Sequence, residues 1–162
     1  MNLLLAKRAI EILKTEGWVQ VFKKTYIYLL SKIVFHVASK LYSVNSRGYW
    51  NFRMKYDWNS VGGRGQTALF AASLFANIDF KKINHVKSVL DYGCATGDSA
   101  PYFKIFLPNS KIYLYDLSEE GLNKAINKYQ RFLGVEKWNP KVKVNFVYCS
   151  NVIEHVENPK TL

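Results

Sequence analysis

The second half of the chain carries two short apolar runs that each end in an aspartate. The first run ends at Asp91 and breaks at once into a glycine-containing turn, and the second begins at Ile112 and ends at Asp116. Short apolar runs bounded by turn residues are typical of buried strands in a parallel sheet. The pattern therefore predicts two sheet strands, the first of which leads through the turn into a helix.

Helical spacing dominates elsewhere. Residues 3–15 predict a first helix, and residues 19–44 predict a longer one. The apolar stripe of the longer helix consists of Phe22, Tyr26, Leu29, Ile33, Val37 and Leu41. Residues 67–80 predict a helix before the first strand, and residues 118–133 predict another that Ser118 caps and Gly134 ends. Residues 45–66 mix aromatic side chains, arginines and glycines without clean periodicity, which favours a connection that acts as a lid.

The glycine turn indicates a ligand site. Glycine allows the backbone to take positive φ and to approach a ligand closely. A strand, a glycine turn and a helix in this order place free backbone N–H groups at the edge of a parallel sheet, where nucleotide-like ligands bind. Asp116 lies 19 residues after Gly97, close to the spacing at which a carboxylate after the next strand binds ribose hydroxyls. The turn has neither the glycine order of dinucleotide-binding proteins nor the Gly-Lys-Ser/Thr of a P-loop.

The turn resembles motif I of the class I S-adenosylmethionine-dependent methyltransferases, commonly written Asp-x-Gly-x-Gly-x-Gly. The chain keeps three residues of that motif and has alanine at the middle glycine. The resemblance implies S-adenosylmethionine as the cofactor and S-adenosylhomocysteine as the product. It assigns the methionine part of the cofactor to the turn, whose residues are Asp91, Tyr92, Gly93, Cys94, Ala95, Thr96 and Gly97. It assigns the ribose to Asp116, with Leu117 and Ser118 beside it.

Residues 144–159 extend the resemblance. An apolar strand followed by Asn151 and by Glu154-His155 resembles the fourth strand and the next helix of these enzymes, so Asn151 joins the implied cofactor site. In many of them an N-terminal segment with Tyr-Trp…Arg closes over the cofactor, which implies cofactor contacts for Trp50 and Arg53. The alternative is that the aromatic residues of this segment attach the N-terminal helices to the core.

The implied fold is α/β, a Rossmann-like parallel sheet that forms part of the class I methyltransferase fold, preceded by N-terminal amphipathic helices. Residues 1–66 would form the basic helices and the lid segment, and residues 67–162 the cofactor-binding domain. The interval 135–143 is too short for the usual third strand, adenine-contacting loop and crossover. We therefore expect a shortened form of the fold or a sheet that another chain completes.

The chain favours an oxygen acceptor by elimination. The Asn/Asp-Pro-Pro-aromatic motif of amino methylation is replaced by Ser150-Asn151-Val152, and no Pro-Cys nucleophile is present. His155 is the candidate base for a hydroxyl acceptor, because histidine is a common general base in enzymes. The alternative is that His155 only packs at a helix start. No metal site is predicted, since Asn151 replaces the first glutamate of the Glu-x-x-Glu-His pattern of small-RNA terminal methylases.

The N-terminal helices are strongly basic, which adds membrane binding to their possible roles. The net charge is +11, and residues 1–60 carry ten lysines and arginines against three acidic residues. A basic helix with an aromatic and aliphatic stripe is typical of proteins that lie on anionic membranes, whereas the same stripe can also pack on its own domain. Lys32 and His36 interrupt the apolar run, so a transmembrane helix is not predicted.

Three functions stay open. The first is O-methylation of a surface glycan or a lipid-linked sugar precursor, because the N-terminus loosely resembles bacterial polysaccharide-cluster enzymes. The second is RNA methylation, to which the basic charge would lend phosphate affinity, although nucleic acid is the less favoured partner. The third is a non-catalytic remnant that binds a membrane or a partner. Two cysteines without a secretory signal predict a cytoplasmic protein, peripheral at the inner membrane if the helices bind lipid, and a homo-oligomer is compatible with all three.

Overall fold

A four-stranded parallel sheet forms the centre of the molecule. The computed structural model describes residue 11, residues 14–15 and residues 17–156. The strands are β1 (Ser88–Tyr92), β2 (Lys111–Tyr115), β3 (Glu136–Lys137) and β4 (Phe146–Cys149), and they are paired in the order β3-β2-β1-β4. Every pairing is parallel. The predicted α/β class with a Rossmann-like parallel sheet is confirmed.

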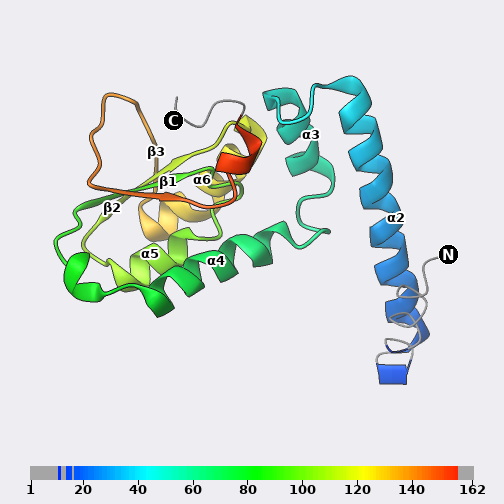
Figure 1. Ribbon diagram of the computed structural model, residues 1–162, viewed down its shortest axis with the longest axis horizontal. Helices are drawn as coiled ribbons and strands as arrows, with labels where there is room; N and C mark the ends of the chain where they lie inside the picture. Colours follow the sequence, from blue (N-terminus) through cyan, green and yellow to red (C-terminus); the bar gives the residue numbers. More distant parts are fainter. Residues whose placement is uncertain (1–10, 12–13, 16, 157–162) are drawn as a thin grey trace.

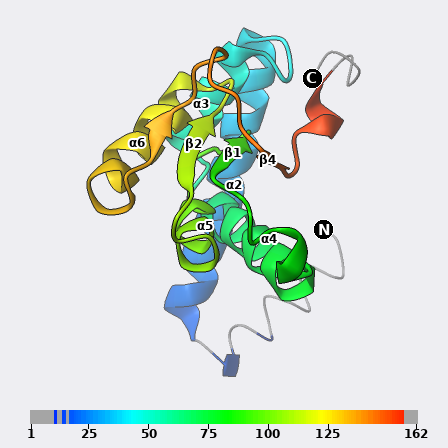
Figure 2. The ribbon, with the colours of Figure 1, turned by 90° about the vertical axis from the view of Figure 1, so that its left-hand side faces the viewer.

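Three helices pack against one face of this sheet, as Figure 2 shows. They are α4 (Gly63–Asn77), α5 (Ala100–Phe106) and α6 (Glu119–Leu133). The core between them and the sheet contains Val89, Ile112 and Leu114 from the strands with Phe75 and Phe103 from the helices. The middle residues of β1 and β2 are buried without alternation, which explains why both strands appear as continuous apolar runs in the sequence.

Helix α6 follows the sequence prediction. The hydroxyl of Ser118 accepts the N–H of Gly121 at 3.1 Å, which caps the first turn. Glu119 and Glu120 lie in that turn, where negative charge is favourable next to the helix dipole. Gly134 ends the helix in the left-handed conformation, with φ of +66°. This helix therefore forms from local signals that the sequence displays directly.

Two N-terminal helices precede the α/β body. Helix α2 (Trp18–Leu41) extends beside the body as an arm, and α3 (Arg47–Tyr56) lies between the arm and the sheet (Figure 1). Val34 and Ala38 are the buried residues of α2, and the ring of Phe35 meets that of Tyr49 edge-on at 6.4 Å. The helix predicted for residues 3–15 lies almost wholly outside the described residues. Within the described part of the chain, no helix combines the length and the apolar character needed to cross a bilayer.

The structure corrects the prediction for residues 45–66. The segment was expected to be an irregular connection, but it contains α3, and α4 already begins at Gly63. Ser46 caps α3 by accepting the N–H of Tyr49 at 3.3 Å. The side chain of Asn51 accepts hydrogen bonds from Ser118 and from the N–H of Glu120, which ties α3 to the start of α6. These tertiary bonds stabilise a helix whose own sequence has no regular apolar face.

The interval 135–143, which was expected to be too short for a strand, a loop and a crossover together, contains a very short third strand and no helix. Strand β3 needs only two residues, which pair with Tyr113 and Leu114 of β2. The following N–H, that of Trp138, donates to the carbonyl of Leu114 at 2.9 Å. Residues 138–145 then connect β3 to β4 without a helix. Two short 3₁₀ turns complete the described elements, η1 (Phe80–Lys82) before β1 and η2 (Ile153–His155) after β4.

Candidate functional site

The glycine turn after β1 is held against the end of β2. The N–H groups of Gly93 and Cys94 both donate to the carbonyl oxygen of Tyr115, at 2.8 and 2.9 Å. Gly93 has φ of +82°, and a Cβ at this position would collide with the side chain of Val152. Both the backbone conformation and the available space therefore require glycine.

Asp116 secures the same turn from the end of β2. Its two carboxylate oxygens accept the N–H of Ala95 and the N–H of Ser118, each at 2.7 Å. Burial raises the pKa of Asp116, while these two backbone hydrogen bonds act in the opposite direction. A carboxylate can accept about four hydrogen bonds, so two acceptor positions of Asp116 remain for a ligand.

Asp91 lies behind the turn rather than on its surface. Only 2% of the residue is exposed, and the hydroxyl of Ser99 donates to its carboxylate. Burial raises the pKa of Asp91 to about 7, the Ser99 hydrogen bond partly opposes this shift, and the charge of Asp116 adds to it. Asp91 therefore changes its protonation state near neutral pH.

Asp98 connects the turn to two helices, a role that the sequence prediction missed. One carboxylate oxygen accepts hydrogen bonds from Lys128 at 2.8 Å, Tyr129 at 2.9 Å and Arg64 at 3.1 Å. The other oxygen accepts the hydroxyl of Thr96 at 2.6 Å. Burial alone would raise the pKa of Asp98, but these hydrogen bonds outweigh it and hold the pKa below its ordinary value. The cations come from α4 and α6, so only long-range packing assembles this cluster.

A cavity of about 730 Å³ opens at the carboxyl ends of β1 and β2. Gly93, Ala95, Asp116 and Leu117 line it on the side of the sheet. The opposite walls come from the connection between α2 and α3, from α3 itself, from the start of α4 and from η2. Ligand sites of parallel α/β sheets usually lie at this edge, and the size is typical of small-molecule sites.

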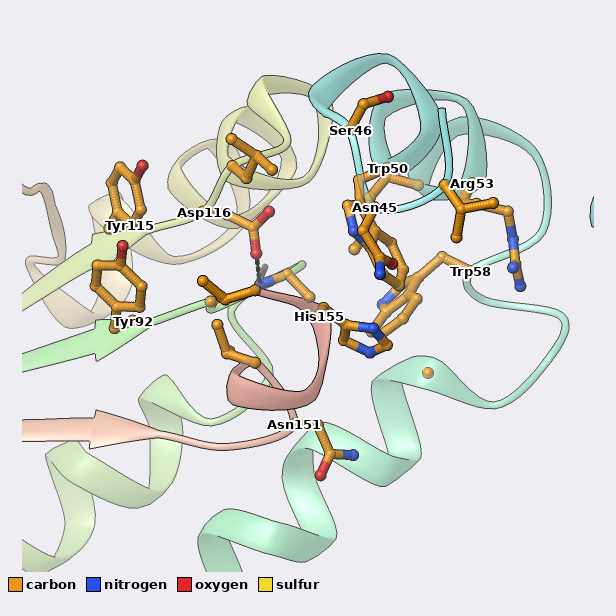
Figure 3. A pocket seen from close by; sticks show the side chains of 18 of the residues that line it. Asn45, Ser46, Trp50, Arg53, Trp58, Tyr92, Tyr115, Asp116, Asn151 and His155 are labelled. Carbon is orange, nitrogen blue, oxygen red and sulfur yellow. Dashed lines mark hydrogen bonds between the residues drawn. The ribbon is translucent and has the colours of Figure 1, made fainter. Parts of the chain in front are cut away.

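Two tryptophans and a histidine form the wall that faces the sheet edge. Trp50 meets the ring of His155 edge-on, with the ring centroids 5.0 Å apart. The indole N–H of Trp58 donates to Thr96 at 3.2 Å, which connects this wall to the Asp98 cluster. Figure 3 shows the imidazole of His155 beside both indoles. His155 therefore belongs to the cavity and does not pack in the core.

Arg53 lines the cavity with its stem, but its guanidinium has partners within the chain. The Nε group donates to Asp57 at 2.7 Å, and Nη1 donates to the hydroxyl of Tyr49 at 3.0 Å. Burial alone would lower the pKa of Arg53, but these two partners outweigh it and raise the value. In Figure 3 the guanidinium points away from Asp116.

Three described residues other than glycine have positive φ, and all three line the cavity. They are Asn45, Ala95 and Asn151, with φ of +67°, +50° and +55°. Asparagine tolerates this left-handed region better than most residues, whereas alanine adopts it at an energetic cost of about 1–2 kcal/mol. Backbone strain of this kind tends to gather at functional sites.

The structure brings most of the predicted site residues together. The cavity lining includes Trp50, Arg53, Tyr92, Gly93, Ala95, Asp116, Leu117, Asn151 and His155. The other predicted residues support the turn from behind: Cys94 points into the core, Thr96 binds Asp98, and Ser118 caps α6. Gly97 allows α6 to approach, since a Cβ there would lie 2.8 Å from the Cβ of Ala125. No cluster of metal-binding side chains occurs among the residues that the structure describes.

The chain is similar to known methyltransferases in sequence and in structure. A family model described as a methyltransferase domain matches residues 66–162. Among solved structures, the chain is similar to magnesium protoporphyrin IX methyltransferase from Synechocystis PCC 6803 with bound SAM, at 23% identity and a TM-score of 0.40, covering 60% of this chain and 48% of that one. For the same enzyme with bound SAH the identity is 22% and the TM-score 0.38, covering 58% and 44%. The chain thus spans less than half the length of these structures. No curated protein matches it.

Proposed function

Because the chain belongs to the methyltransferase domain family, as its resemblance to class I S-adenosylmethionine-dependent methyltransferases predicted, we propose that its cavity binds S-adenosylmethionine and directs the methyl group to a neutral hydroxyl acceptor. The acceptor that we favour is a sugar of a surface glycan or of a lipid-linked precursor. Residues 66–162 supply the cofactor side of the cavity, and the helices before them supply the acceptor side.

The observation that carries this proposal is the position of Asp116. Its carboxylate lies at the cavity, directly beside a turn with positive φ, and keeps two free acceptor positions. Ribose hydroxyls are natural donors to such a carboxylate. The volume of about 730 Å³ suits a cofactor together with part of an acceptor. Gly93 and Ala95 would hold the methionine part of the cofactor, and Leu117 would contact the part beyond the ribose.

The lining of the acceptor side supports a neutral, hydroxyl-rich molecule. Ser43, Asn45 and Ser46 offer uncharged hydrogen-bonding groups opposite Trp50 and Trp58. Arg53, the cation of the lining, is already paired with Asp57 and Tyr49. An aromatic surface beside neutral polar groups suits a sugar ring better than a phosphate.

The residues of this chain would contribute mainly by positioning. Bound S-adenosylmethionine supplies a methyl group on a sulfonium, and charge is neutralised during its transfer, so alignment provides much of the rate. His155 would accept the proton of the acceptor hydroxyl through its imidazole, whose orientation is limited by the edge-on contact with Trp50. The walls formed by α3 and η2 would restrict access of water.

We also propose that the protein is cytoplasmic and peripheral at the inner membrane. Both cysteines are free thiols, Cys94 buried and Cys149 exposed, which suits a reducing compartment. An RNA acceptor is less well supported, because the cavity lining combines aromatic and neutral side chains rather than unpaired cations.

Calorimetric titration with S-adenosylhomocysteine tests the proposal. Wild-type protein should bind, and Asp116→Ala should bind about 10- to 100-fold more weakly, because a hydrogen bond to a charged acceptor contributes about 1.5–3 kcal/mol. Asp116→Asn keeps one acceptor oxygen for the turn, and Asp79→Ala serves as a control, since Asp79 is exposed and binds only the N–H of Lys81. A folded wild type that does not bind the nucleoside would refute the proposal. Equal affinity of folded Asp116→Asn, Asp116→Ala and wild type would remove the ribose role.

A further inference from the structure

We infer that α2 is a membrane-docking arm, whose outward apolar stripe lies in the headgroup region of an anionic bilayer and brings the mouth of the cavity to the lipid surface. The stripe consists of Trp18, Phe22, Tyr26, Leu29 and Ile33. The docking of α2 is independent of the chemistry of the cavity. The statement about the mouth rests on the proposed function, because it assigns the acceptor to the membrane surface.

The stripe faces away from the other residues that the structure describes. Its members follow one another at intervals of four, four, three and four residues, which places them on one side of a helix. Between 54% and 68% of each is exposed. The contact with α3 lies on the opposite side, where Val34 and Ala38 are buried. The stripe thus does not serve the packing of α2 on α3.

Lysines border this stripe and no acidic residue accompanies them. Helix α2 contains Lys23, Lys24, Lys32 and Lys40 and lacks Asp and Glu from Trp18 to Leu41. By helical rotation of about 100° per residue, Lys23 and Lys32 lie on either side of the stripe. Long lysine side chains in this position can reach lipid phosphates while their stems stay among apolar groups. The ammonium of Lys32 lies 5.5 Å from the ring of Tyr28, which keeps it near the helix surface.

An anionic bilayer satisfies both features of α2 at once. Aromatic and aliphatic side chains are stable at the boundary between headgroups and acyl chains, and lysines beside them are attracted by anionic lipid. A nucleic acid would pair with the lysines but would leave the aliphatic members of the stripe in water. A second copy of α2 would cover the stripe but would bring its flanking lysines close to lysines of the same sign. The combination of charge and apolar area therefore favours lipid.

The arm leads directly into the cavity wall. Leu41, Tyr42 and Val44 at the end of α2 and just beyond it are apolar and exposed as well, with exposed fractions of 62%, 40% and 56%. Val44 also lines the cavity, together with Ser43, Asn45 and Ser46 of the same connection. An acceptor with a polar head and an apolar tail could therefore place its head in the cavity while its tail remains in the bilayer beside α2. The acceptor class that fits is an amphiphile resident at the membrane surface.

Vesicle flotation tests the docking. Wild-type protein should float with vesicles that contain phosphatidylglycerol and stay in solution with phosphatidylcholine alone. Phe22→Gln combined with Leu29→Gln should abolish flotation, and Lys23→Gln combined with Lys32→Gln should weaken it by about fivefold per lysine. Ile105→Gln combined with Phe132→Gln is the matched control, because these side chains are 68% and 79% exposed on α5 and α6. Flotation lost equally in the control pair, or equal flotation with both lipids, would overturn the inference. The inference would also be overturned if the protein bound polyuridylate tightly and did not float. The same holds if the wild type formed a dimer in solution that the Phe22→Gln and Leu29→Gln substitutions dissociate.

The position of the mouth needs a separate measurement. A nitroxide at Val44→Cys, in a Cys149→Ser background, should become accessible to oxygen and shielded from an aqueous nickel chelate on vesicles. A nitroxide at Phe132→Cys on α6 should stay accessible to the chelate. Equal chelate access at both positions would show that the arm docks with the mouth turned away from lipid. Calorimetry with S-adenosylhomocysteine separates the two proposals, since the stripe variants should bind it like wild type whether or not they float.

Discussion

Removal of the Asp98 carboxylate should destabilise the whole α/β body, because four donors from three parts of the chain meet at this side chain. In Asp98→Ala, Arg64 and Lys128 can turn to water, since 49% and 39% of their side chains are exposed. Their ion pairs with Asp98 are therefore discounted. The hydroxyls of Thr96 and Tyr129 are less exposed and lose their acceptor, at a cost of about 1–3 kcal/mol each. We expect a loss of about 2–5 kcal/mol in the free energy of unfolding.

The effect should depend on pH with a defined sign. The pKa of Asp98 is lowered in the folded state, so its contribution is fully present above the unfolded pKa of about 3.9 and is lost as pH falls through the folded value. Urea denaturation followed by circular dichroism at pH 7 and at pH 3 measures the difference. The gap between wild type and Asp98→Ala should narrow at the lower pH.

The matched control is Asp79→Ala, which removes an exposed carboxylate with a single backbone hydrogen bond. It should destabilise the protein by about 1 kcal/mol or less. If Asp98→Ala lost no more stability at pH 7 than this control, the idea that Asp98 unites the turn with α4 and α6 would be refuted. A loss that is equal at both pH values would instead assign the effect to packing rather than to the ionised carboxylate.

Three further predictions concern the turn and the cavity. The pKa of Asp91 is raised to about 7, so its contribution should make wild-type stability fall between about pH 4 and pH 7 and then level off. Urea titrations should show that Asp91→Asn removes this contribution, which is about 4 kcal/mol for a shift of about three pKa units. Gly97→Ala should lower the unfolding free energy by about 2–4 kcal/mol, because Gly97 has positive φ and an added Cβ would lie 2.8 Å from α6. The control is Gly134→Ala, which should lose only about 1 kcal/mol, since Gly134 has positive φ but open space around it. On a glycolipid extract, His155→Ala should transfer labelled methyl groups about 10²-fold more slowly with unchanged affinity for S-adenosylhomocysteine, and equal rates would exclude it as the base.

The sequence predicted those parts of the fold that depend on neighbouring residues. Helix α6 shows its cap at Ser118 and its end at Gly134, and the buried strands appear as apolar runs, so both were found. Helix α3 was missed because its stability comes from Asn51, whose partners lie more than 60 residues away. Strand β3 was missed because two residues are too few to produce a pattern.

The candidate site was predictable to a similar extent. Gly93 and Asp116 were expected at one site because their spacing reflects a strand-turn-helix-strand unit, and both line the cavity. The role of Asp98 was missed, because its positively charged partners, Arg64 and Lys128, are far from it in the sequence and form no recognisable motif with it. Arg53 was expected to contact the cofactor, and in the structure its guanidinium pairs with Asp57, four residues later at the end of the same helix. This helical spacing of four was visible in the sequence and would have indicated an internal partner.

The left-handed residues of the cavity limit how the pocket can be redesigned. A saturation library over the lining would treat Asn45, Ala95 and Asn151 as ordinary side-chain positions, yet each also sets a backbone angle. Most substitutions there would cost about 1–2 kcal/mol of stability in addition to any effect on the acceptor, and β-branched residues would cost most. Glycine is the exception, since it adopts these angles freely. Variation of acceptor preference is therefore best sought at Ser43 and Gln66, which line the same space without that constraint.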